Sequence, residues 1–339
     1  MTRLLMVVSS AREMRVADGT HPTGYWPEEV FKPYDRFAAA GVEVVVATPD
    51  GKAPQPDPWG LEPFFHYPDE DEDFMASVFR SFARDVEDVR VTLHHLTELN
   101  LIAARRVHQA LTEAGMDAEQ ARAKVEEHGA AAHREDRDFV EVLAEDPDVT
   151  ALVDAGRLRA LADEVRREAE QEAQRVADRL AAIEPLQHPV RLGDLSDEEV
   201  LSFDALFFPG GHGPMVDLAD NSDARRVLRL FQERQKTIAA LCHGPAVLLS
   251  AGDGAEGVWL FDGYKITAFT DEEEEDTQAG HRGMLWYLEG ALKNAGAVFD
   301  DADAPWTSHV IVDRNLITAQ NPASSEAAAE AVLKRLEML

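Results

Sequence analysis

The stretch that most constrains this chain surrounds its only cysteine. Residues 237–241 form an apolar run typical of a short buried strand, and the run ends at Cys242. Gly244 permits a tight turn and Pro245 suits the first turn of a helix, so the sequence predicts a strand, a sharp turn and a helix. Helix N–H groups at such a corner favour an anion and lower the pKa of a thiol. Cys242 is therefore a candidate nucleophile; the alternative is a small residue buried in the core.

Composition limits the classes of partner and compartment. The chain has 339 residues, 64 of them acidic and 33 basic, with a formal net charge of −31. Such acidity argues against binding to nucleic acid or to an anionic membrane surface. One cysteine excludes an intramolecular disulfide and suits a reducing compartment. No stretch approaches the ~20 apolar residues of a membrane span, and the first residues resemble a buried strand more than a signal peptide. We therefore expect a cytoplasmic protein.

Strands and helices alternate in both terminal parts of the chain. Between apolar runs at 3–8 and 42–47, a helix is expected to begin at Pro27 and end near Gly41. Further strands are expected at 188–192, 203–208, 237–241 and 264–270, with a helix at 221–235, a hairpin at 306–317 and a last helix from Ser324. This alternation predicts a mainly parallel sheet with helices on both faces.

The middle of the chain breaks this pattern. From about Asp69 to Glu184 it is rich in Ala, Glu, Asp, Arg and Leu, and its apolar residues follow helical spacing. We expect an α/β domain formed by residues 1–66 and 187–339, and a helical insertion of three to five helices at 67–186, with one of its turns near Gly129. The insertion is expected to be a lid, a dimerisation arm or a partner surface.

Two further segments are expected at the sheet edge that carries Cys242. The loop Phe-Pro-Gly-Gly-His-Gly (208–213) follows a strand, and its glycines let a backbone N–H approach a ligand as an oxyanion donor must. The loop lacks the glycine patterns that bind nucleotides, and its alternative reading is a plain turn. The acidic run 271–276 also follows a strand, so it either forms a solvated loop or brings one carboxylate to this edge.

Three motifs together resemble the ThiJ/PfpI superfamily. They are Phe-Pro-Gly-Gly-His-Gly (208–213), Ala-Leu-Cys-His-Gly-Pro-Ala (240–246) and Asn-Pro-Ala-Ser (321–324). The chain looks most similar to the heat-shock-protein-31-like, glyoxalase III branch, whose pattern is also matched by Thr23-Gly24 with Glu29 and Pro33 and by Phe269-Thr270-Asp271. The resemblance covers about residues 1–66 and 187–339. It implies a flavodoxin-like three-layer sandwich with a nucleophile elbow, and the helical insertion lies outside it.

The resemblance also implies roles for particular residues. Cys242 would be the nucleophile, His243 its partner, and Glu29 the glutamate that hydrogen-bonds the thiol. Glu28 is the alternative to Glu29, and both also suit the first turn of a helix without any catalytic role. Backbone N–H groups of Gly211 and His243 would form the oxyanion hole.

The acid that orients the histidine is implied to be Glu274, the third residue after Asp271. Because glutamates follow one another here, Asp271 and Glu273 remain alternatives.

The implied reaction is that of a glutathione-independent glyoxalase. The cysteine adds to the aldehyde of methylglyoxal or glyoxal, and lactate or glycolate is released, with no metal, nucleotide or other cofactor. The substrate is thus a 2-oxoaldehyde, and the family implies a homodimer. A holding chaperone or a protein deglycase is the alternative, and a cysteine peptidase or amidase is disfavoured. A glutamine amidotransferase would need a late His-x-Glu, which neither His281 nor His309 provides.

Overall fold

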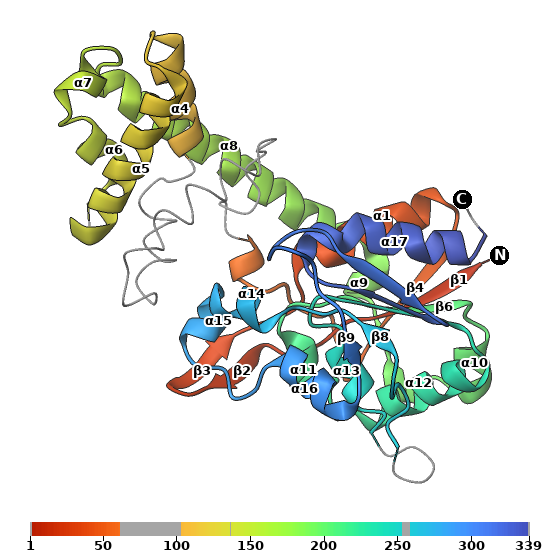
Figure 1. Ribbon diagram of the computed structural model, residues 1–339. Helices are drawn as coiled ribbons and strands as arrows, with labels where there is room; N and C mark the ends of the chain where they lie inside the picture. Colours follow the sequence, from red (N-terminus) through yellow and green to blue (C-terminus); the bar gives the residue numbers. More distant parts are fainter. Residues whose placement is uncertain (1, 62–102, 136, 253–257, 338–339) are drawn as a thin grey trace. The chain divides into compact units, whose positions relative to one another are not determined.

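The computed structural model describes residues 2–61, 103–135, 137–252 and 258–337 (Figure 1). The chain divides into two compact units, one formed by residues 1–60 and 177–339 and the other by residues 61–176. We predicted an α/β domain formed by residues 1–66 and 187–339 and an insertion at 67–186. Both predicted boundaries therefore lie later in the chain than the boundaries between the two units. Residues 67–102 of the predicted insertion lie outside the described residues.

The first unit is built on a seven-stranded sheet in the order β10-β11-β7-β6-β1-β4-β5. Its strands are β1 (Arg3–Val7), β4 (Glu43–Thr48), β5 (Val190–Arg191), β6 (Ala205–Phe208), β7 (Thr237–Leu241), β10 (Val310–Asp313) and β11 (Leu316–Ala319). Neighbouring strands run parallel, except for the antiparallel pair β10 and β11. In register, Leu5 lies opposite Leu206, and Leu206 lies opposite Ile238. The predicted mainly parallel sheet is therefore confirmed.

Helices cover both faces of this sheet (Figure 1). The helices of the unit are α1 (Pro27–Ala39), η1 (Trp59–Leu61), α9 (Glu184–Gln187), η4 (Leu192–Asp194), α10 (Asp197–Leu201), α11 (Gly213–Asp217), α12 (Ser222–Glu233), α13 (Ala246–Leu249), α14 (Asp271–Glu275), α15 (Gln278–His281), α16 (Leu288–Ala295), η6 (Pro322–Ser324) and α17 (Ser325–Arg335). On one face, α1 packs against α17, and Phe37 of α1 meets Phe207 edge-on, with ring centroids 5.4 Å apart. Because adjacent residues of a strand point to opposite faces of the sheet, Phe208 lies on the other face from Phe207. There it belongs to the hydrophobic core that also contains Phe231 of α12. The three-layer α/β arrangement is confirmed.

Several local predictions were wrong. The segment between β1 and α1, for which no strand was predicted, contains a hairpin, β2 (Glu13–Val16) with β3 (Gly19–Pro22), whose Met14 and Val16 alternate toward the core. Only two residues of the predicted strand 264–270 are extended, as β8 (Lys265–Ile266), which pairs with β9 (Val298–Phe299) outside the main sheet. These elements are too short to give a clear sequence period.

The second unit is helical in its described part. Its elements are α4 (Ala104–Glu113), α5 (Ala118–Glu135), α6 (Phe139–Leu143), α7 (Pro147–Thr150) and α8 (Ala155–Ala181), the last of which continues past the boundary between the units. Leu111, Val125 and Phe139 are fully buried, so the unit has an apolar core of its own. Gly129, predicted to mark a turn, lies inside α5, where flanking alanines and glutamates maintain the helix.

Within the described ranges, none of the helices combines the length and the apolar character needed to cross a bilayer.

Candidate active site

Cys242 lies on a strained turn directly after β7. Its φ is +59°, in the left-handed region that a side chain with a Cβ rarely occupies. The conformation is fixed from both sides, because its N–H donates to Ala319 O at 2.8 Å and its carbonyl accepts from Phe269 N at 3.0 Å. Gly244 completes the turn: a Cβ there would lie 2.2 Å from Phe208 O. The predicted nucleophile elbow is therefore present, with the cysteine at its tip.

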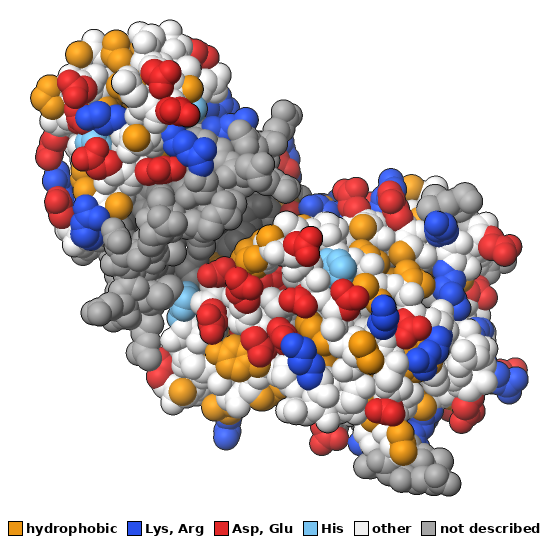
Figure 2. Space-filling view, in the orientation of Figure 1, with side chains coloured by type: hydrophobic (Ala, Val, Ile, Leu, Met, Phe, Trp, Pro, Cys, Tyr) orange, Lys and Arg blue, Asp and Glu red, His pale blue; other side chains and the backbone are white. Residues whose placement is uncertain are grey.

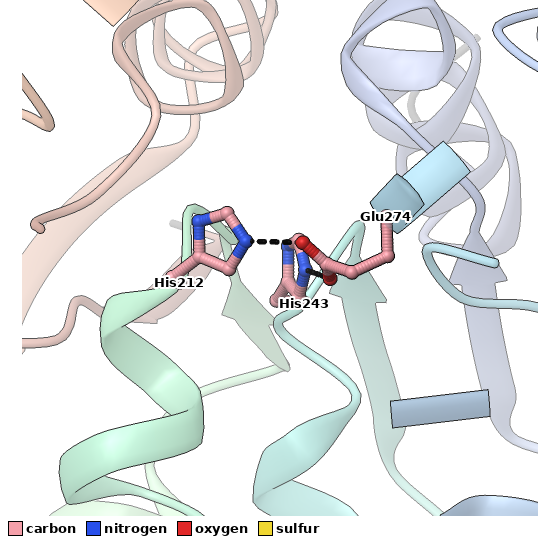
Figure 3. Close-up of side chains that lie close together, drawn as sticks. All are labelled: His212, His243 and Glu274. Carbon is pink, nitrogen blue, oxygen red and sulfur yellow. Dashed lines mark hydrogen bonds and ion pairs between the residues drawn. The ribbon is translucent and has the colours of Figure 1, made fainter. Parts of the chain in front are cut away.

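A chain of contacts links the thiol to an acid. Cys242 Sγ lies 3.3 Å from His243 Nδ1. His243 Nε2 lies 2.7 Å from Glu274 Oε2 (Figure 3). Burial would raise the pKa of Glu274, but the two histidines that it contacts, His212 and His243, hold this pKa well below its usual range. Glu274 is therefore a carboxylate that accepts the Nε2–H of His243. We assign the tautomer from this contact, which leaves Nδ1 free to accept the thiol proton.

The acidic run that supplies Glu274 is a helix and not a solvated loop. Thr270 caps α14 in a capping box with Glu273, and both Glu273 and Glu274 are buried. Glu273 Oε1 turns away from His243 and accepts from the backbone N–H of Trp306 at 2.7 Å. Asp271 is half-buried beside Glu289. Of the three candidate acids, Glu274 is the one that hydrogen-bonds His243.

Glu29 approaches the thiol from the first turn of α1. It is fully buried, and its Oε2 accepts from the Gly210 N–H at 2.7 Å. Burial raises the pKa of Glu29 to about 8, although interactions with Cys242 and the Gly210 N–H counter the increase. Among the described residues, Oε1 is buried and meets no partner at hydrogen-bond geometry. Because Oε2 accepts, a proton on this carboxyl group belongs on Oε1.

Glu28 does not share this environment. Its side chain is 22% exposed and pairs with Lys32 at 3.2 Å, one helical turn away. The structure thus brings Glu29, and not Glu28, to Cys242.

The two predicted oxyanion donors lie beside the sulfur. The backbone N–H of Gly211 interacts with Cys242 and counters the rise of its pKa. Within the described chain, the His243 N–H donates to no backbone carbonyl. Gly211 has a φ of +79°, and a Cβ there would lie 2.5 Å from Trp26 N, so the loop requires glycine at this position. Both N–H groups can therefore bind an oxygen that develops negative charge next to Cys242.

The predicted low pKa of the thiol was wrong. Burial, followed by the charge and hydrogen bonding of Glu29, raises the pKa of Cys242 well above its ordinary value. The helix after the turn, α13, has only four residues, so it contributes a weaker N-terminal field than a long helix would. The resting group is therefore a thiol, and attack requires a base to remove its proton.

His212 is a site residue that the sequence analysis missed. Its Nε2 lies 2.6 Å from Glu274 Oε1, and its ring centroid lies 4.3 Å from that of His243 (Figure 3). Thr277 Oγ1 donates to the same Oε1 at 2.8 Å. His212 stands between two glycines at the carboxyl end of β6, and this position at the edge of a parallel sheet was the signal that pointed to it.

His212, His243 and Glu274 also have the residue types of a metal site. One ligand atom from each lies within 4.8 Å of the other two. However, the histidine nitrogens lie 2.6 and 2.7 Å from the carboxylate oxygens, whereas ligand atoms around a tetrahedral zinc with bonds of about 2.0–2.1 Å lie about 3.3 Å apart. The observed spacing fits hydrogen bonds between the three side chains.

Comparison with known proteins finds a family model that is similar to part of this chain. Residues 192–335 match the model of the DJ-1/PfpI family. The chain is 29% identical over 145 residues to Glyoxalase 3 of Candida albicans, which covers 42% of this chain and 61% of that protein. It is 32% identical over 155 residues to Protein/nucleic acid deglycase HchA of Staphylococcus aureus, covering 42% and 50%. The chain thus spans about half to three fifths of the length of these curated relatives.

A solved structure extends the likeness in fold. The crystal structure of glyoxalase III from Candida albicans is similar with a TM-score of 0.56 at 19% identity, over 98% of this chain and 96% of that chain. At this identity the likeness concerns the fold alone, and it confirms the predicted flavodoxin-like class.

The expectation that nucleic acid is not a partner is corrected by these relatives. HchA of Staphylococcus aureus is named a deglycase of protein and nucleic acid. The net charge of a whole chain predicts how strongly its surface attracts or repels a phosphate backbone. A site that acts on a small adduct on a base does not need a basic surface. Acidity therefore does not exclude nucleic acid here.

Proposed function

We propose that this chain is a glutathione-independent glyoxalase, and the match of residues 192–335 to the DJ-1/PfpI family model supports this. It would convert methylglyoxal or glyoxal to lactate or glycolate, with Cys242, His243, Glu29 and Glu274 as its working side chains. The observation that carries the proposal is Cys242 Sγ on its strained turn, 3.3 Å from a histidine nitrogen that is free to accept a proton. The relative named Glyoxalase 3 supports the same reaction class.

The first step forms the covalent adduct. The thiol proton moves to His243 Nδ1 while the sulfur bonds to the aldehyde carbon, and the carbonyl electron pair moves to oxygen. The N–H groups of Gly211 and His243 bind this oxyanion. His243 then returns the proton to the oxygen, which gives a neutral hemithioacetal. Glu274 accepts from His243 Nε2 throughout and stabilises the transient imidazolium.

The second step moves hydrogen between the two substrate carbons. Ionised Glu29 removes the proton from the carbon bonded to sulfur, and His243 carries the hydroxyl proton of that carbon to the ketone oxygen, which gives an enediolate. Glu29 then returns its proton to the neighbouring carbon, and the C–O⁻ group next to sulfur becomes the thioester carbonyl. A pKa of about 8 suits this role, because both forms of Glu29 are accessible near neutral pH.

The last step releases the product. His243 removes a proton from water, the hydroxide adds to the thioester carbon, and the C–S bond breaks to release lactic acid. The returning proton restores the thiol. One methylglyoxal and one water thus give one lactate, and no cofactor enters the balance.

The proposal is tested by lactate formation from methylglyoxal in the absence of glutathione. We expect turnover by the wild type, none by Cys242→Ala, and at least a ~100-fold loss of kcat in Glu29→Gln, because a general base is removed. Glu28→Gln is the matched control and should retain activity, since Glu28 faces Lys32. A wild type without turnover, or equal turnover in Cys242→Ala, would overturn the proposal.

A protein or nucleic acid deglycase is the second candidate, favoured by the relatives of that name. The same thiol would attack an adduct already formed between a dicarbonyl and an amine. An assay on a glycated substrate from which free methylglyoxal has been removed distinguishes the two activities. Only a deglycase restores the amine when no free aldehyde is present. A holding chaperone would retain its activity in Cys242→Ala. The homodimer and the cytoplasmic location stay predictions.

A further inference from the structure

The carboxylate of Glu274 forms hydrogen bonds with two histidines. Its Oε2 lies 2.7 Å from His243 Nε2, and its Oε1 lies 2.6 Å from His212 Nε2 (Figure 3). Thr277 Oγ1 is the further donor to Oε1, and all four side chains are buried. We propose that His212 is a positioning residue: it holds one oxygen of Glu274 and carries the positive charge there, so that His243 stays a neutral base able to take the thiol proton.

The surroundings of His212 favour a charge on this ring. Glu274 approaches from α14, and Asp57, which is 2% exposed, approaches from the segment before η1. Burial would lower the pKa of His212, but these two acids outweigh it and raise the pKa. His21 of β3 also faces this group, and burial and the charge of His212 lower its pKa to about 4, so it is neutral. His212 is therefore the cation between two acids.

A cation on His212 acts directly on His243. The two ring centroids are 4.3 Å apart, so two positive rings on one carboxylate would repel each other strongly. Burial and then the charge of His212 lower the pKa of His243, against the opposing effect of Glu274. A neutral His243 whose Nε2–H is donated to Glu274 presents the lone pair of Nδ1 to the sulfur, 3.3 Å away. The charge on His212 thus sets the base strength at the thiol.

The single cysteine makes this coupling measurable. The rate of alkylation of the protein by iodoacetamide reports on Cys242 alone, because the chain has no other thiol. His212→Gln keeps an amide N–H near Glu274 and removes the charge at every pH. His243 should then become more basic and stabilise the thiolate, and the pH midpoint of alkylation should shift down by about one unit. His188→Gln, an exposed histidine in the same unit, is the control and should leave the midpoint unchanged.

The outcome separates this role from a packing role. A midpoint that stays in place, or that moves to higher pH, in folded His212→Gln would overturn the proposal. If that variant does not fold, NMR of the histidine rings in the wild type decides: His212 should be an imidazolium and His243 neutral near pH 7, and the opposite assignment would refute the idea. The inference rests on Cys242 as the nucleophile of the proposed function, but alkylation measures the coupling whether or not methylglyoxal is turned over.

Discussion

At the scale of single residues, the site is defined by buried groups whose protonation states differ from those in water. Glu29 is a buried acid that forms no ion pair with a described residue, and burial raises its pKa to about 8. The Cys242 thiol is held neutral for the same reason, since burial penalises the charged form. In the proposed mechanism, reactivity therefore depends on a proton transfer to His243 and not on a thiolate that is already present.

The raised pKa of Glu29 predicts how stability depends on pH. The pKa rises from an ordinary 4.5 to about 8, so between these values the folded chain keeps a proton that the unfolded chain releases. The stability that this group contributes is complete below about pH 4.5 and is lost as pH rises through about 8. In Glu29→Gln, the fall in Tm between about pH 5 and pH 8 should be smaller than in the wild type. Parallel curves for the wild type, this variant and Glu28→Gln would contradict the assignment.

Several of these residues could be predicted from the sequence, because each directly follows or begins a recognisable element. Cys242 and His243 end an apolar run, and Glu29 follows Pro27 at a helix start. His212 was missed, because its place after a strand was the one signal that the sequence offered for it. A histidine between glycines gives no period, and its role depends on Glu274, which lies far along the chain.

At the scale of elements, the short helix α14 decides which acid meets His243. Successive residues of a helix point about 100° apart, so Glu273 and Glu274 cannot face the same side. Glu273 Oε1 accepts from Trp306 N at 2.7 Å, Asn321 Nδ2 at 2.8 Å and Gln320 Nε2 at 3.0 Å. These partners come from distant segments, which fix the rotation of α14 and aim Glu274 at the histidines. Such long-range contacts explain why the sequence alone left the three acids unresolved.

This anchoring predicts a strong effect of Glu273→Gln. In glutamine, an NH₂ group replaces one of the two carboxylate oxygens. This NH₂ group would face hydrogen-bond donors that the carboxylate oxygen had accepted from, so the free energy of unfolding should fall by about 1–3 kcal/mol. Glu274 should then be misplaced and kcat should fall by at least about tenfold, since one misaligned hydrogen bond costs that much. Glu275→Gln, on the exposed side of the same helix, should change neither. Equal kcat and equal urea midpoints in the two variants would refute the anchoring role.

At the scale of the whole molecule, the parallel sheet and its helices follow from the alternation of apolar runs in the sequence. Acidic side chains are spread over the visible face, with basic ones between them (Figure 2). What the sequence could not predict were the short elements, such as the hairpin of β2 and β3 and the pair of β8 and β9, because two to four residues carry no clear period.

The two units predict that the first folds without the second. Gly60 packs against Pro27 at the start of α1, and Arg179 forms an ion pair with Asp35 of the same helix. Pro27 and Asp35 are eight residues apart in α1, so the two ends to be joined lie near points about 12 Å apart along this helix. A ten-residue Gly/Ser linker has a mean end-to-end distance of about 16–19 Å and can span this gap. Replacing residues 62–176 by this linker should leave the pH profile of Cys242 alkylation unchanged. An insoluble product or an inert thiol would show that the second unit is needed for the fold of the first.

The most direct test of the central claim is to observe the covalent adduct on Cys242. Glu29→Gln should still add its thiol to methylglyoxal but should be unable to move hydrogen between the substrate carbons. With substrate carrying an NMR-visible isotope at the aldehyde carbon, we predict a protein-bound hemithioacetal signal in this variant. The signal should be absent in Cys242→Ala. The same signal in both variants, or no signal in Glu29→Gln while the wild type forms lactate, would contradict a mechanism that begins at Cys242.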